Sequence, residues 1–61
     1  MSNYTNSQEM PLGLGMALAE NLDAMNRFAA MSKTQQSAFI AGTHAIRSKQ
    51  EMRQYVQRLL G

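Results

Sequence analysis

The sequence predicts an all-α protein, a small three-helix bundle with a flexible N-terminal tail. Apolar residues recur at spacings of three and four, two capping signatures divide the chain, and no segment shows the alternating pattern of a half-buried strand. The expected helices cover residues 14–30, 33–43 and 49–60, all within one domain, 11–61. Because the turns between them are short, neighbouring helices are expected to pack against one another around a single core.

The tail and the first helix are separated by glycines. Residues 1–10 are polar and show no apolar period, so we expect them to form the flexible tail. Gly13 and Gly15 disfavour helix, and we interpret them as a hinge between the tail and the first helix. Within that helix, Asn21 lies in the apolar stripe, where a polar residue either bonds to water at the rim of the core or fixes the register of packing. The stripe itself consists of Leu14, Leu18, Leu22, Met25, Phe28 and Ala29.

The second and third helices each begin at a predicted capping box. Residues 32–35 (SKTQ) and 48–51 (SKQE) both place a serine three positions before a Gln or Glu, so that side chains and backbone N–H groups can bond reciprocally. Phe39 and Ile40 are the apolar residues of the second helix. Gly42 offers the left-handed conformation that commonly ends a helix, and the end could equally lie near Ala45. The third helix has its apolar residues on one arc, namely Met52, Tyr55, Val56, Leu59 and Leu60.

Length and composition point away from catalysis. With 61 residues, the chain is too short for a core that also holds an elaborate buried active site, so we expect no enzyme. It has no cysteine and one histidine, so we expect neither a metal nor a cofactor and interpret His44 as a structural residue near the end of the second helix. The absence of cysteine favours a cytoplasmic location. No stretch approaches the roughly 20 apolar residues of a membrane span, and the start of the sequence does not resemble a signal peptide.

Two methionines are the candidate partner-binding residues. Met16 and Met31 project toward a side of the first helix that a three-helix core is expected to leave open. Methionine side chains are flexible and suit surfaces that accommodate varied partners. We therefore expect a protein–protein interaction module whose partner is another protein or, in a homodimer, a second copy of the chain.

The alternative is weak nucleic-acid binding or a regulatory accessory role. Residues 32–61 carry five Lys or Arg residues against one Glu, and the candidate contacts are Arg47, Lys49, Arg53 and Arg58. Arg53 and Arg58 are expected on different sides of the third helix, so the pattern lacks a basic stripe that could follow a nucleic-acid backbone. Membrane binding is not expected either, because the polar face of the first helix is acidic to neutral. The sequence thus favours a protein partner over nucleic acid.

Several segments resemble short uncharacterised all-helical proteins of Firmicutes-type bacteria. The resemblance covers about residues 12–60. It is carried by residues 14–22 (LGMALAENL), 28–36 (FAAMSKTQQ), 39–40 (FI), 43–46 (THAI), 48–52 (SKQEM) and 55–59 (YVQRL). It implies an all-helical bacterial protein of the cytosol, and it implies no activity and no functional residue.

Overall fold

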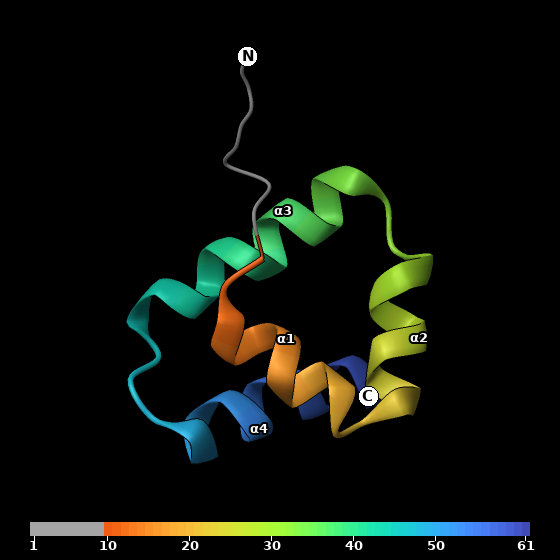
Figure 1. Ribbon diagram of the computed structural model, residues 1–61. Coiled ribbons are helices and arrows are strands. Elements are labelled where there is room, and N and C mark those ends of the chain that lie inside the picture. The colour runs from red at the N-terminus through yellow and green to blue at the C-terminus, as the bar shows by residue number, and fades with distance from the viewer. Residues whose placement is uncertain (1–9) are drawn as a thin grey trace.

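The computed structural model describes residues 10–61, and within them it contains helices and turns but no strand. The prediction of a small all-α bundle is therefore confirmed. The predicted flexible tail lies outside the described residues, except for Met10. In chain order the elements are α1 (Leu12–Ala19), α2 (Leu22–Ala30), α3 (Lys33–Ala41), the 3-10 turn η2 (Gly42–Ala45), α4 (Lys49–Gln57) and the 3-10 turn η3 (Arg58–Leu60) (Figure 1).

The expected helix 14–30 is in fact two helices. Asn21 leaves the helical conformation, with φ −137° and ψ 86°, and its side-chain oxygen accepts a hydrogen bond from the Ala24 N–H at 3.2 Å. Asparagine is among the preferred N-cap residues because it satisfies an amide that has no partner within the helix. The polar residue in the apolar stripe is thus the cap of α2. The expectation of a hinge at Gly13 and Gly15 was also wrong, since both glycines lie inside α1.

Serine caps begin the next two helices, as predicted. The Ser32 hydroxyl accepts from the Gln35 N–H at 3.1 Å and the Gln35 side chain accepts from the Ser32 N–H at 3.0 Å, which completes the capping box of α3. In α4 the Ser48 hydroxyl accepts from the Glu51 N–H at 3.1 Å. The Glu51 carboxylate, however, accepts from the N–H of Arg47 instead of that of Ser48, so the second box is only half formed.

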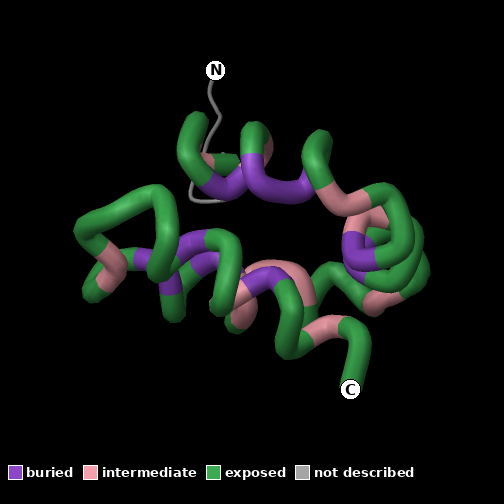
Figure 2. The backbone as a smooth tube through the Cα atoms, turned by 90° about the horizontal axis from the view of Figure 1, so that it is seen from below, coloured by how far each residue is buried: buried purple, intermediate pink, exposed green. Residues whose placement is uncertain are grey.

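The core is formed where α1 packs against α4 and α2, and where α2 packs against η3. In Figure 1, α1 lies between α3 and α4, and Figure 2 shows that the buried stretches of the helices face the middle of the molecule. The buried apolar residues are Leu14, Ala17, Leu18, Ala24, Phe28, Ile40, Met52 and Val56.

Three aromatic rings close one side of this core. The ring centroids of Phe28 and Phe39 are 5.9 Å apart, and the Tyr55 ring is stacked on Phe39 at 4.3 Å. The Tyr55 hydroxyl donates a hydrogen bond to the Phe39 carbonyl oxygen at 2.6 Å. We call Phe28, Phe39 and Tyr55 the aromatic cluster.

Gly42 does not adopt the left-handed conformation expected at a helix end. It lies instead beside the aromatic cluster. Its φ is −66°, an ordinary helical value, at the junction of α3 and η2. A Cβ at this position would collide with the Tyr55 hydroxyl. The glycine is therefore required by the close approach of a side chain from α4, which a local sequence pattern does not reveal.

Candidate functional site

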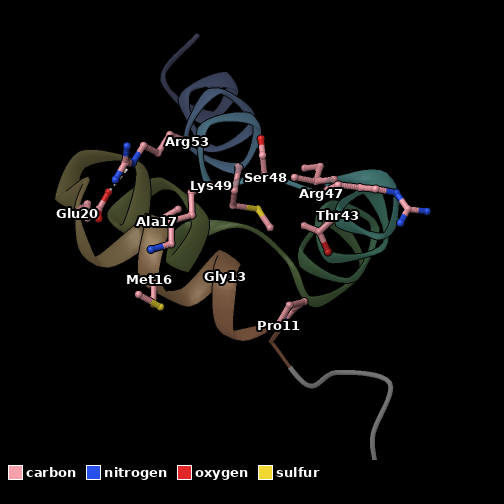
Figure 3. Close-up of a pocket in the computed structure, with 12 residues that line it drawn as sticks. Pro11, Gly13, Met16, Ala17, Glu20, Thr43, Arg47, Ser48, Lys49 and Arg53 are labelled. Atoms are coloured by element: carbon pink, nitrogen blue, oxygen red, sulfur yellow. Dashed lines mark hydrogen bonds and ion pairs between the residues drawn. The ribbon is translucent and has the colours of Figure 1, made fainter.

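An open pocket of about 370 Å³ lies between α1 and the chain from η2 to α4 (Figure 3). We call it the α1/α4 pocket. Pockets for small ligands have volumes of about 300–1,000 Å³, so this one is large enough for an apolar side chain or a small molecule. Its lining consists of Pro11, Gly13, Met16, Ala17, Glu20, Thr43, Ile46, Arg47, Ser48, Lys49, Met52 and Arg53.

Small residues on α1 leave the space that becomes the pocket. Gly13 and Ala17 are one helical turn apart and therefore lie on the same face of α1. Met52 of α4 is buried opposite them, and a Cβ at Gly13 would lie only 3.6 Å from its terminal methyl carbon. Thr43 is buried as well, and its hydroxyl donates to the Ile40 carbonyl oxygen at 2.7 Å. The apolar part of the pocket is thus built on residues that also stabilise the fold.

The rim of the pocket is basic. Arg53 and Glu20 form an ion pair at one end, with Nε and Oε1 3.0 Å apart and both side chains more than half exposed. Arg47 and Lys49 also line the pocket, and within residues 10–61 neither side chain has an ion-pair partner. In Figure 3 the Lys49 side chain extends toward α1, whereas Arg47 points away from the Glu20–Arg53 pair. Among residues 10–61, three cations against one carboxylate give the rim a positive balance.

The structure separates the two predicted methionines. Met16 lines the pocket with 49% of its surface exposed. Met31 follows α2 as its C-cap, is half-buried and packs against the core, and it is not among the pocket residues. Only Met16 of the two is therefore part of the candidate site.

Three of the four predicted basic residues line the pocket, and the fourth lies elsewhere. Arg47, Lys49 and Arg53 meet at the α1/α4 pocket, although they are spread over seven positions of the sequence. Arg58 instead lies over the ring of Tyr55, with its guanidinium carbon 5.4 Å from the ring centroid. The prediction that Arg53 and Arg58 lie on different sides of the last helix agrees with this arrangement.

Sequence reasoning missed most of the apolar half of the pocket. Met52 was assigned to the core alone, and Gly13 to a hinge. The available signal was the spacing of Gly13 and Ala17, which places two small residues on one helical face. A second missed feature is Leu12, which is 79% exposed at the start of α1.

The other features considered from the sequence are possible metal ligands, His44 and possible membrane-spanning helices. Within residues 10–61 no group of three His, Asp or Glu side chains could hold a metal ion. His44 is exposed on η2. Nor is any helix of the described part long and apolar enough to cross a membrane.

Comparisons with known proteins identify no relative of this chain. No family model, no curated protein and no solved structure matches the chain significantly. The function is therefore inferred from the geometry of the α1/α4 pocket.

Proposed function

We propose that the protein is a small helical protein–protein interaction module that binds an apolar side chain of its partner in the α1/α4 pocket. The observation that carries this proposal is the pocket itself, which is open to solvent although Met52 at its base is buried and Met16 at its wall is half exposed. Both side chains are unbranched and can adjust to a bound group. A pocket of this kind beside flexible methionines favours binding of a partner over catalysis.

The outer face of α1 supports the same proposal. The eight residues of α1 include no charged side chain, so the helix is apolar on the solvent side as well as on the core side. Leu12 and Met16 lie one turn apart and share that outer face. An exposed apolar surface that adjoins a pocket is typical of a site for another protein chain. The lack of cysteine in the whole sequence supports the cytoplasm as the place of this interaction.

The test is a selection from a displayed library of random peptides of about 12 residues, long enough for a short helix. The immobilised wild-type protein is expected to enrich peptides that carry a large apolar residue. Met16→Glu should lower the affinity for the selected peptides about tenfold or more, because it places a carboxylate in the wall of an apolar site. Leu22→Glu is the matched control, since it adds the same charge at an exposed apolar position of α2, outside the pocket and outside the outer face of α1.

Two results would contradict the proposal. One is a selection in which no peptide is enriched over the bare support. The other is a set of peptides that bind Met16→Glu as tightly as the wild type, with both proteins equally helical by circular dichroism.

A second copy of the chain is the other candidate occupant. The solution mass, measured by light scattering over about a hundredfold dilution, separates the two cases. We expect a monomer throughout, since two copies would bring two positively charged rims together. A dimer that Met16→Glu dissociates and Leu22→Glu does not would instead identify the pocket as a homodimer interface.

A further inference from the structure

We propose that the segment bound in the α1/α4 pocket is acidic, with an apolar side chain in the pocket and Asp or Glu residues beside it that pair with Arg47 and Lys49. This inference rests on the proposed function and adds the chemistry of the partner. The supporting observation is charge complementarity between a positive rim and a negative ligand.

The unpaired positive charges of the rim are those of Arg47 and Lys49, whose side chains point in different directions (Figure 3). Arg53 is already paired with Glu20. Arg47 and Lys49 flank the N-terminal cap of α4, and no acidic side chain of the described residues pairs with them. The nearest acidic residue in sequence, Glu51, directs its carboxylate to the backbone N–H of Arg47. A ligand carboxylate beside either side chain therefore meets a cation that has no ion-pair partner among residues 10–61.

The orientation of α4 adds to this potential. A helix N-terminus carries a partial positive charge, which favours an anion within the first turn, and the Glu51 carboxylate offsets only part of this charge at α4. Lys49 is the first residue of α4, and its side chain extends toward α1 along the pocket. The apolar walls of the pocket also reduce screening by solvent, so a carboxylate near its mouth is attracted more strongly than one on an open surface.

The same site is poorly suited to nucleic acid. Proteins that bind single strands stack bases on aromatic side chains, and within the described part of the chain no aromatic residue lines the pocket. The aromatic rings of residues 10–61 are those of the aromatic cluster, which pack on one another. The Glu20 carboxylate at the rim would repel phosphates, and Arg58 is held over Tyr55. A peptide with few charges and one apolar side chain fits these features better than a polyanion.

The experiment compares the peptides that two proteins select. From the same random library, the wild type should enrich peptides with an excess of Asp and Glu close to the apolar residue. The double variant Arg47→Glu and Lys49→Glu should lose these peptides, with affinities lowered about tenfold or more by like-charge repulsion. We expect the double variant to keep its fold, because Lys49→Glu places an acid in the first turn of α4 and Arg47 bonds to Glu51 through its backbone; circular dichroism checks this.

The double variant Arg27→Glu and Lys33→Glu is the control for net charge, because it changes the charge of the protein by as much as Arg47→Glu and Lys49→Glu do. Arg27 in the last turn of α2 and Lys33 in the first turn of α3 are both exposed and outside the pocket, so the site itself is unchanged. This control should leave the affinity for acidic peptides within about twofold of the wild type at about 0.15 M salt, where exposed charges more than about 8 Å apart are screened. An equal loss in the two double variants would mean that the attraction is a property of net charge, and would overturn the assignment to Arg47 and Lys49.

The outcomes distinguish this inference from the proposed function. Enriched peptides that need Met16 but show no acidic excess would refute the acidic partner and leave the interaction module standing. A complete lack of enriched peptides would refute both. A labelled random single strand or duplex of DNA serves as the third arm. If either binds at about 0.15 M salt more tightly than the best peptide, with a strong dependence on salt, nucleic acid replaces the acidic peptide as the ligand.

Discussion

Helix α4 borders two regions of opposite character. In the aromatic cluster, Tyr55 is stacked 4.3 Å from Phe39 and donates a hydrogen bond to its carbonyl oxygen, so this region is closed by rings and by a polar contact. In the second region, Met52 lies at the base of the α1/α4 pocket, whose rim carries charges more than half exposed to water. The aromatic cluster uses its side chains to hold the helices together, whereas the pocket keeps adjustable side chains at a surface. We expect stability to depend on the first region and binding on the second.

Truncation of one side chain in each region should give the largest difference in unfolding free energy between the two regions. Phe28→Ala removes a buried ring and should cost about 3–5 kcal/mol of unfolding free energy. Met16→Ala, at a half-exposed position, should change it by less than about 1 kcal/mol. Urea unfolding followed by circular dichroism measures both.

A chain of this length has a total stability of only about 3–9 kcal/mol, so the loss in Phe28→Ala takes a third of it or more and, at the lower end of this range, unfolds the protein. Phe28→Leu keeps most of the apolar volume and provides a folded intermediate case. Equal losses in Phe28→Leu and Met16→Ala would contradict the contrast between the two regions.

The same substitution, glycine to alanine, should have opposite signs in the two regions. Gly42→Ala forces the Tyr55 hydroxyl away from its present position and should destabilise the protein by about 1–3 kcal/mol. Gly13→Ala meets the Met52 methyl carbon at an ordinary contact distance of 3.6 Å inside a helix. It should stabilise the protein by up to about 1 kcal/mol, because alanine loses less conformational freedom than glycine. Thermal unfolding of the two variants measures the signs, and a stabilised Gly42→Ala would show that the Tyr55 contact is not required.

The Tyr55 hydroxyl makes the stability of the aromatic cluster depend on pH. Burial raises the pKa of Tyr55 above its usual value, and the nearby Arg58 guanidinium offsets part of the increase. The folded state therefore holds this proton more tightly than the unfolded state, so stability is unaffected below pH about 10 and falls as the pH rises above it. Tyr55→Phe should cost about 1 kcal/mol at neutral pH through the lost hydrogen bond to Phe39.

Thermal unfolding between neutral and alkaline pH checks the sign. The wild type should lose more stability above pH about 10 than Tyr55→Phe does, since the variant has no proton to lose at this position. Parallel pH profiles for the two proteins would show that the hydroxyl is equally acidic in the folded and unfolded chains.

The sequence was sufficient for the elements whose determinants are local. The serine caps of α3 and α4 depend on residues three positions apart, and the structure has both. The break between α1 and α2 was missed because the apolar period continues through the corner at Asn21, so periodicity alone cannot separate two helices from one. The role of Gly42 was missed for a different reason, namely that its determinant is Tyr55, thirteen positions away.

The site was predictable only in part for the same physical reason. Met16 was identified from its place outside the apolar stripe of one helix, which is a local property. Its placement beside Arg47 and Lys49 depends on how α1 packs on α4, and that packing follows from contacts between distant residues. Met31 was assigned to the same surface because a continuous helix was assumed, and that assumption failed at Asn21.

Of all the changes considered, loss of the Glu20–Arg53 ion pair should have the smallest effect on stability. It therefore tests whether the rim of the pocket contributes to binding more than to the fold. Both side chains are more than half exposed, and such pairs contribute between about 0.2 and 1 kcal/mol. A double-mutant cycle with Glu20→Gln and Arg53→Gln measures the coupling, which should decrease as salt screens it. The same Glu20→Gln variant should bind acidic peptides more tightly than the wild type, because it releases Arg53 to the pocket. A coupling well above 1 kcal/mol, or unchanged binding, would mean that this end of the pocket is a fixed part of the fold and not a surface available to a partner.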